Sequence, residues 1–343
     1  MAEMTTLYEK DISRAVAAHL PWEKLKGKNV LVTGATGLIG SCLVRVLLAN
    51  ADLDCQVYAA GRNHERATNI FGKQWADHRF HFLHFDVREP LSTDITFHYI
   101  VHAAGGATPL LYQTDPVGVM QANLMGVDRL LSYGVAHGLE RFVYVSSGEV
   151  YGQGDGRAMT EDYSGYVNTT SVRSCYPSAK RASETLAVCY GAQYGFGVCI
   201  ARPSHVYGPQ FTESDNRAYA QFVRNVLRGE DIVLQSTGEA FRSWTYAVDC
   251  ATALLFILLK GVAGEAYNIA NEKSNVTIRT LAETVARLAG RRVVFNIPAD
   301  ASHGNTTPIT RAVFSTAKLE ALGWTPLFGL EEGLRHTIES ATP

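Results

Sequence analysis

The sequence predicts an α/β fold in which a doubly wound parallel sheet carries a smaller, mostly C-terminal lobe. A glycine-rich turn follows the apolar run 30–33 and leads into an apolar helical stripe at 43–48. Strand-like apolar runs and helical patterns then keep alternating, as a parallel sheet with crossover helices requires. Hydroxyl, carboxylate and basic residues cluster directly after these runs. Because ligands bind at the carboxyl ends of the strands in such sheets, we expect the functional site there.

The bulk composition narrows the class of protein. The 343 residues are 46% hydrophobic and 19% charged, with a formal charge of −2, so one large or two modest domains can bury ample core. The near-neutral charge argues against nucleic acid as a partner, and no apolar stretch approaches the roughly 18 residues of a membrane span. The first residues lack signal-peptide features, and the six cysteines have no metal-type spacing. We therefore expect a cytoplasmic protein with reduced thiols, no membrane contact and no metal site.

The first functional motif is the loop Thr33-Gly-Ala-Thr-Gly-Leu-Ile-Gly40. Gly34 allows a sharp turn, Gly37 allows the backbone to approach a pyrophosphate, and Gly40 allows close packing of helix on strand. The free N–H groups at the helix start would face the anion. The alternative is a purely structural turn, since close packing also uses glycine. The flanking strand and helix patterns favour a dinucleotide cradle, lined by Gly34, Thr36, Gly37, Leu38, Ile39 and Gly40.

The end of the next strand, 55–60, bears on cofactor choice. An acidic residue about 20 positions after the glycine loop usually holds the ribose 2′-hydroxyl of NAD, but that place falls at Gly61. Arg62 and Asn63 follow, and a guanidinium there could pair with a 2′-phosphate, which favours NADP over NAD. The alternative is that Arg62 is a solvated loop residue. A third strand, 80–85, ends at Asp86 and Val87, where the adenine edge would lie.

Tyr176 and Lys180 form the candidate proton-transfer pair. They open a predicted helix and, four residues apart, lie one turn apart on one face. A phenol with a free pKa near ~10 is a poor base at neutral pH, but an adjacent ammonium and a positive nicotinamide ring would stabilise the phenolate. The spacing alone also arises by chance in helices. The strand 141–145 strengthens the case, because it ends in the hydroxyls of Ser146 and Ser147 and the carboxylate of Glu149.

With these residues in view, the chain from about 28 to about 337 resembles the extended short-chain dehydrogenases/reductases, specifically the nucleotide-sugar epimerases, dehydratases and decarboxylases. Beside the glycine loop and Tyr176-x-x-x-Lys180, the shared motifs are His102-Ala-Ala104, Asn123, Ser146-Ser147, Arg202-Pro203, Tyr207-Gly-Pro209, Arg242-Ser-Trp-Thr-Tyr-Ala-Val-Asp249, Tyr267-Asn-Ile-Ala270 and Leu322-Gly-Trp-Thr-Pro326. The resemblance implies a tightly bound NAD or NADP, a lobe that closes on a nucleoside diphosphate sugar, and an opening oxidation of a sugar hydroxyl, usually at C4.

The resemblance also assigns residues. The implied catalytic residues are Ser147, Glu149, Tyr176 and Lys180. Beside the glycine loop, Arg62, Asn63, Asp86 and Val87, the implied cofactor residues are Ala103, Ala104, Gly105, Asn123, Ser146, Tyr176, Lys180, Arg202 and Ser204. The implied substrate residues are Thr108, Ser147, Gly148, Glu149, Arg173, His205, Arg217 and Arg242.

The second half of the reaction depends on a few positions. Glu149 matches dehydratases and glucuronate decarboxylases, which ranks dehydration or decarboxylation above 4-epimerisation; alternatively it caps the following turn. Gly148 departs from both, because dehydratases carry an aspartate there and decarboxylases a serine. Arg173 and Arg242 match decarboxylases and would suit a sugar carboxylate, or alternatively the diphosphate or a carboxylate at the domain boundary. His205 stands where the family usually has asparagine, and an apolar-face histidine is more often a core residue.

The expected organisation has three parts. Residues 1–26 form an N-terminal arm, 27–205 plus about 240–262 the dinucleotide-binding domain, and about 206–239 plus 263–343 the substrate lobe. We expect a homodimer through a four-helix bundle built from helices 116–137 and 176–195, whose surplus apolar residues are Met120, Leu124, Tyr133, Leu186, Val188 and Tyr190. The rival functions are an NADPH-dependent keto-sugar reductase and a non-catalytic cofactor-binding regulator.

Overall fold

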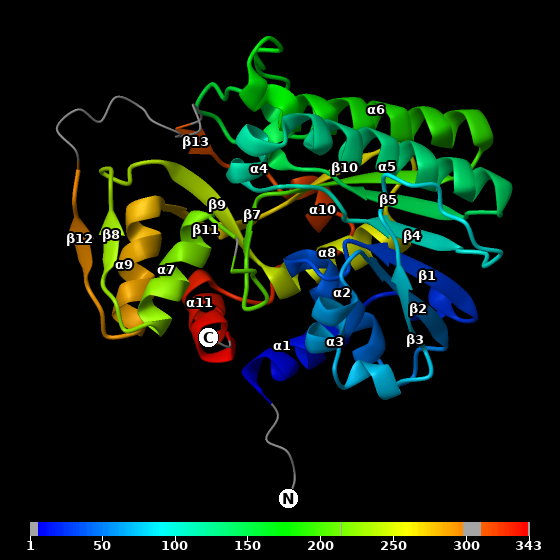
Figure 1. Ribbon diagram of the computed structural model, residues 1–343, viewed down its shortest axis with the longest axis horizontal. Coiled ribbons are helices and arrows are strands. Elements are labelled where there is room, and N and C mark those ends of the chain that lie inside the picture. The colour runs from blue at the N-terminus through cyan, green and yellow to red at the C-terminus, as the bar shows by residue number, and fades with distance from the viewer. Residues whose placement is uncertain (1–5, 214, 298–309, 342–343) are drawn as a thin grey trace, which may run out of the picture.

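A seven-stranded parallel sheet forms the centre of the molecule. The computed structural model describes residues 6–213, 215–297 and 310–341 (Figure 1). The sheet has the order β10-β6-β5-β4-β1-β2-β3, and every neighbouring pair is parallel. Its strands are β1 (Lys28–Thr33), β2 (Cys55–Gly61), β3 (Phe80–His84), β4 (Tyr99–His102), β5 (Arg141–Val145), β6 (Gly197–Pro203) and β10 (Ala266–Ile269). The predicted doubly wound parallel sheet is confirmed.

Helices cover both faces of this sheet, which explains why its strands are continuous apolar runs. On one face α2 (Leu38–Ala49) packs against α8 (Ala247–Lys260), and both share a core with Val30 and Val32 of β1. On the other face lie α5 (Pro116–Ala136) and α6 (Cys175–Tyr194), and a separate core there contains Leu31 of β1. Successive residues of β1 thus face opposite helix layers, as the period of two in a strand requires.

The second lobe lies to the left of the main sheet in Figure 1 and is built from a four-stranded sheet, a two-stranded sheet and three helices. In the first sheet β9 pairs with β11, β13 and β7, and the second sheet joins β8 to β12. The elements are β7 (His205–Tyr207), α7 (Ala218–Leu227), β8 (Ile232–Leu234), β9 (Phe241–Tyr246), β11 (Asn271–Thr277), α9 (Ile278–Leu288), β12 (Val293–Phe295), β13 (Arg311–Ala312) and α11 (Leu330–Ser340).

Strand β10 corrects one expected boundary. The sequence analysis placed everything after about residue 262 in the substrate lobe, but β10 pairs with β6 and completes the main sheet. Four residues are too short to show a diagnostic periodicity, and the partner strand lies far away in the sequence. The chain therefore returns to the first domain before it re-enters the second lobe.

The N-terminal arm is part of the core. Helix α1 (Leu7–Val16) packs on α2, α8 and α11, and it buries Tyr8 and Ile12. Its buried Asp11 accepts hydrogen bonds from the Tyr246 hydroxyl at 2.9 Å and contacts Nδ1 of His336 at 2.9 Å. The arm thus connects its own helix α1 to α11, the last helix of the described residues.

The outer surface of α5 and α6 differs in part from expectation. The Tyr133 side chain is buried, and its hydroxyl donates to the carbonyl oxygens of Thr93 and Ile95, so it does not supply free apolar surface. Leu186, Val188 and Tyr190 are half-buried against the core beneath. Met120 and Val117 are exposed. No helix in the described ranges is long and apolar enough to cross a bilayer.

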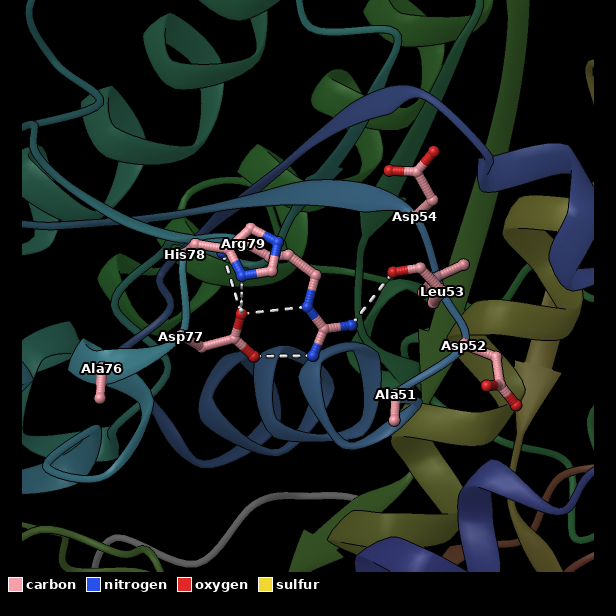
Figure 2. A pocket seen from close by; sticks show the side chains of 8 residues that line it. All are labelled: Ala51, Asp52, Leu53, Asp54, Ala76, Asp77, His78 and Arg79. Carbon is pink, nitrogen blue, oxygen red and sulfur yellow. Dashed lines mark hydrogen bonds and ion pairs between the residues drawn. The ribbon is translucent and has the colours of Figure 1, made fainter.

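At the amino end of the sheet, Arg79 joins three segments (Figure 2). Its guanidinium donates to the carbonyl oxygens of Leu48, Asn50 and Leu53 at 2.6–3.1 Å. It also donates to both carboxylate oxygens of Asp77, at 3.0 and 2.7 Å. Carbonyl groups at the C-terminal end of α2 have no helical partners, and Arg79 supplies donors to them.

Candidate active site

The glycine loop has the shape that a dinucleotide requires. Gly34 has a φ of +66°, and a Cβ there would lie 2.6 Å from the carbonyl oxygen of Ala103. A Cβ at Gly40 would lie 2.3 Å from the carbonyl oxygen of Gly34. Gly37 is the N-cap of α2, and no side chain caps this helix end. The first N–H groups of α2 are thereby left for a ligand, and the positive end of the helix dipole favours an anion. These residues fit the pyrophosphate of a dinucleotide.

Basic residues surround the adjoining rim. Arg62 is 70% exposed at its side chain, and its guanidinium lies 3.9 Å from the carboxylate of Asp86. Asp86 is held more closely by Arg88, whose hydrogen bonds lower the pKa of Asp86 to about 2. Asn63 caps α3 (His64–Ile70) by accepting from the N–H of Arg66. Arg66 itself donates to the carbonyl oxygen of Thr36 in the glycine loop at 2.9 Å. The sequence analysis did not predict Arg66, because no motif marks its position in α3.

The floor beneath the glycine loop is closely packed. A Cβ at Gly105 would lie 2.9 Å from Oδ1 of Asn123, so glycine lets these segments approach. Asn123 donates to the carbonyl oxygen of Val119 and is buried. His102 is buried with Nδ1 2.7 Å from the hydroxyl of Thr33. Ala103, Ala104 and Gly105 follow β4 directly, and the first two of them lie against Gly34.

The structure brings the predicted proton-transfer residues together. Ser147 lies close enough to Tyr176 for its hydroxyl to act on the pKa of the Tyr176 phenol. Lys180 donates to the carbonyl oxygen of Val145 at 2.8 Å, and its Nζ lies 5.7 Å from the centre of the Tyr176 ring. Burial lowers the pKa of Lys180 to about 7. Burial also raises the pKa of Tyr176 above its ordinary value, an effect that the charge of Glu149 reinforces and the neighbouring Ser147 hydroxyl opposes.

Tyr112 completes this cluster, although no sequence motif marks it. It is buried on α4 (Pro109–Thr114), and its ring stacks on Tyr176 at a centroid distance of 5.0 Å. The guanidinium carbon of Arg173 lies 4.7 Å from the centre of the Tyr112 ring. Thr108, expected to bind substrate, is the N-cap of this helix and makes no side-chain capping bond. A stack of Arg173, Tyr112 and Tyr176 thus fixes the orientation of the Tyr176 ring.

Glu149 and Arg173 bind one another. The guanidinium donates to both carboxylate oxygens at 2.8 and 3.0 Å, with the two side chains 30% and 37% exposed. A cavity of about 260 Å³ opens beside this pair, and Tyr166, Asn168 and Ser171 also line it. A substrate carboxylate that bound Arg173 would have to share or replace the bond to Glu149.

The second lobe contributes cations to the other side of the site. Arg217 is paired with Asp215 at 2.9 Å, and its positive charge opposes the rise in the pKa of Tyr176 that burial causes. Arg242 is buried and donates to the carbonyl oxygens of Phe241 and Thr310 at 3.0 Å. Burial and then the charges of Arg242 and Arg217 lower the pKa of His205 to about 3. Among the described residues, Nδ1 of His205 is a buried atom without a hydrogen-bond partner.

Two predicted cofactor residues are bound within the protein. Arg202 donates to both carboxylate oxygens of Glu184 at 3.0 and 2.7 Å and to the Tyr151 hydroxyl at 3.0 Å. These donors link β6 to α6, so a cofactor that contacted Arg202 would have to share them, and the cofactor role of Arg202 stays a prediction. Ser204 lies 2.8 Å from the hydroxyl of Thr245, between the first domain and the second lobe. The sequence offered no sign of the Glu184 pairing, since the two residues lie in different elements.

A last residue without a sequence signal adjoins Gly148. A Cβ placed on Gly148 would lie 2.5 Å from the ring of Phe314, a residue from the C-terminal part of the chain. The side chain of position 148 would point at this ring. Phe314 thus lies against position 148, where this sequence differs from the dehydratases and decarboxylases that it resembles.

Comparisons with known proteins agree with this geometry. UDP-glucuronic acid decarboxylase 6 of Arabidopsis thaliana is 35% identical over 89% of this chain and 86% of its own length. UDP-glucuronic acid decarboxylase 1 of Xenopus tropicalis is 30% identical over 91% of this chain and 71% of its own length. A dTDP-glucose 4,6-dehydratase from Streptomyces venezuelae, solved with NAD, superposes with a TM-score of 0.77 at 27% identity, covering 90% of this chain and 95% of the other. The sequence model of the NAD dependent epimerase/dehydratase family matches residues 30–270, and the chain belongs to this family.

Proposed function

We propose that this enzyme oxidises and then decarboxylates a nucleoside diphosphate sugar that carries a C6 carboxylate, with UDP-glucuronic acid as the candidate substrate. The observation that carries the proposal is the Ser147–Tyr176–Lys180 cluster lying against the Glu149–Arg173 pair. The decarboxylase relatives, which match along nearly the whole chain, support the same reaction. Dehydratase and epimerase structures share the fold. Gly148 lacks the aspartate that the resemblance assigns to dehydratases, and it also lacks the serine of decarboxylases.

The cofactor we propose is NAD, which when bound accepts a hydride from the sugar carbon. Gly34, Gly37 and the N-terminus of α2 would hold its pyrophosphate. Structural relatives at 26–27% identity were solved with NAD. Arg62 stays a candidate ligand for the 2′-phosphate of NADP, and its exposure leaves it free to act in either role.

The residues divide the work as follows. Tyr176 takes the proton from the sugar hydroxyl, because its own hydroxyl is the buried acid–base group at the centre of the cluster. Ser147 hydrogen-bonds to the same oxygen, and the ammonium of Lys180 stabilises the phenolate. The oxidised sugar has a ketone beta to its carboxylate, so loss of carbon dioxide leaves the electron pair of the broken carbon–carbon bond on an enolate. The enolate then takes up a proton at C5, and return of the hydride to C4 would leave NAD unconsumed. Arg173 and Arg242 would orient the carboxylate, while Glu149 holds Arg173 in place.

Mass spectrometry of products from UDP-glucuronic acid, UDP-glucose and dTDP-glucose tests this proposal. We expect loss of carbon dioxide from UDP-glucuronic acid and no net consumption of NAD. Loss of water from either hexose would assign a dehydratase, and an unchanged mass with an inverted hydroxyl would assign an epimerase. Steady consumption of NADPH would indicate a reductase. Cofactor binding without any product would indicate a regulator.

We also infer that the enzyme is a cytoplasmic homodimer through α5 and α6. These two helices lie side by side on one face of the sheet (Figure 1), with Met120 38% and Val117 65% exposed. Apolar residues on an outer helix pair are suited to a twofold contact with a second copy. Met120→Asp should shift light-scattering mass from dimer to monomer, while Ser132→Asp at the opposite end of the helix is a milder control. A wild-type monomer at micromolar concentration would contradict the inference.

A further inference from the structure

Gly148 lies between the two functional residues of one turn. Ser147 precedes it and Glu149 follows it in the short helix Gly148–Tyr151. A Cβ on Gly148 would lie 2.5 Å from Cζ and 2.8 Å from Cε1 of Phe314. Gly148 is not among the glycines with positive φ, so its backbone would accept a side chain. The ring of Phe314 is therefore what opposes one.

The Phe314 ring is fixed from several sides. It is 2% exposed and packs with Val150, Tyr151 and Met159. Its centre lies 5.7 Å from that of Tyr151. Its N–H donates to the Ser243 hydroxyl at 3.3 Å, and Met159 bonds through its backbone to both neighbours of Phe314, at 2.8 and 3.0 Å. A ring held by both its backbone and its neighbours cannot move away without loss of packing.

We propose that Phe314 is a specificity-determining residue that keeps position 148 free of any side chain and so excludes a proton donor beside Ser147. This inference rests on the proposed decarboxylation. Loss of water breaks a carbon–oxygen bond, and the departing hydroxide must receive a proton. Loss of carbon dioxide breaks the bond between C5 and C6 and releases a neutral molecule that needs no proton, while the electron pair stays on the sugar as an enolate that is then protonated at C5. Phe314 thereby favours a reaction in which the leaving group is carbon dioxide.

The site offers few other donors for a departing hydroxide. The carboxylate of Glu149 accepts two hydrogen bonds from Arg173, and an acceptor-only carboxylate has no proton to give. The Ser147 hydroxyl accepts from the N–H of Glu149 at 3.2 Å and lies close enough to Tyr176 to act on the pKa of its phenol. The apolar ring of Phe314 thus occupies the space that an acidic side chain at position 148 would need.

A double-mutant cycle tests the packing without substrate. We expect Gly148→Ser to lower the thermal midpoint by about 2–6 °C, because the added atoms overlap the ring. Phe314→Ala should also lower it, through loss of packing, and Phe314→Leu is the alternative if that variant does not fold. In the double variant, Gly148→Ser should cost at least about 2 °C less than it does alone. Gly329→Ser is the matched control, because a Cβ there meets nothing within 4 Å.

Product analysis tests the consequence for the reaction. Gly148→Ser should reduce decarboxylation at least about tenfold, and adding Phe314→Ala should recover part of that loss. The wild type should release no water-loss product from UDP-glucose or dTDP-glucose. Strictly additive midpoints, or water loss from the wild type, would overturn the inference. Failure to decarboxylate UDP-glucuronic acid, with coupled midpoints, would instead contradict the proposed function.

Discussion

The two ends of the central sheet differ in how completely their polar groups are hydrogen-bonded. At the amino end, Arg79 is buried but bonded to three carbonyl oxygens and the carboxylate of Asp77. At the carboxyl end, Lys180 is buried with one carbonyl partner and a pKa lowered to about 7, and the first N–H groups of α2 have no cap. Polar groups that are paired stabilise the fold. Polar groups that lack partners, or whose pKa is shifted by burial, reduce stability and are available for chemistry.

This contrast separates a charged residue that supports the fold from one that acts on a ligand. Arg79 lines a cavity of about 580 Å³ with Asp52, Asp54 and His78, but these residues precede β2 and β3, at the end opposite the glycine loop (Figure 2). The larger of the two described cavities therefore lies at the end of the sheet opposite the predicted site. The state of the polar groups supports our proposal that the site lies at the carboxyl end.

The largest effect should follow from removing one oxygen at the carboxyl end. Tyr176→Phe keeps the ring that stacks on Tyr112 but removes the acid–base group, so turnover should fall about 10²–10⁴-fold while cofactor stays bound. Product formation and bound-cofactor absorbance measure the two effects. Tyr99→Phe is the control at the amino end, where the hydroxyl donates to the carbonyl oxygen of Lys24. Near-normal turnover of Tyr176→Phe would contradict the assignment.

At the amino end the expected change is in stability alone. Arg79→Ala should lower the free energy of unfolding by about 2–4 kcal/mol, because buried carbonyl groups and Asp77 lose their donors. Urea unfolding measures this loss, and turnover per folded molecule should stay unchanged. Arg157 is a matched control. It forms an ion pair with Asp155 two residues earlier, as Arg79 does with Asp77, but its side chain is 81% exposed. Arg157→Ala should leave the unfolding midpoint unchanged; equal losses for both variants would refute the role of burial.

A pH series should reveal the cost of burying Lys180. Its folded pKa is about 7, well below the ordinary lysine value, so between these values the unfolded chain holds a proton that the folded chain has lost. The contribution of Lys180 to stability should therefore rise with pH above about 7, by at most about 1.4 kcal/mol per pH unit. Urea unfolding of the cofactor-free wild type and Lys180→Met, from about pH 6.5 to about pH 9.5, isolates this difference. Parallel curves for the two proteins would exclude the shift.

The smallest effect concerns cofactor choice at the rim. Arg62→Ala should weaken NADP about tenfold and NAD much less, because a lost guanidinium costs most where it faced a phosphate. Titration calorimetry with both cofactors gives the two affinities. Arg88→Ala serves as the control, since Arg88 is bonded to Asp86. Equal losses of NADP and NAD affinity in Arg62→Ala would mean that Arg62 only stacks or is solvated.

The sequence alone determined the features that depend on local pattern. The alternation of strands and helices predicted the parallel sheet, the spacing of Gly34, Gly37 and Gly40 predicted the cradle, and the interval between Tyr176 and Lys180 placed both on one helix face. Each rests on backbone geometry within a few residues. Such geometry is encoded in the residues themselves.

Tertiary structure alone decided which distant residues meet. It placed β10 in the main sheet, paired Arg202 with Glu184, stacked Tyr112 on Tyr176, and put Phe314 against Gly148. These contacts join segments far apart in the chain, where no periodicity relates one partner to the other. The physical reason is that packing selects side chains by shape and by available partners in three dimensions, so the same residue can line a site or support it.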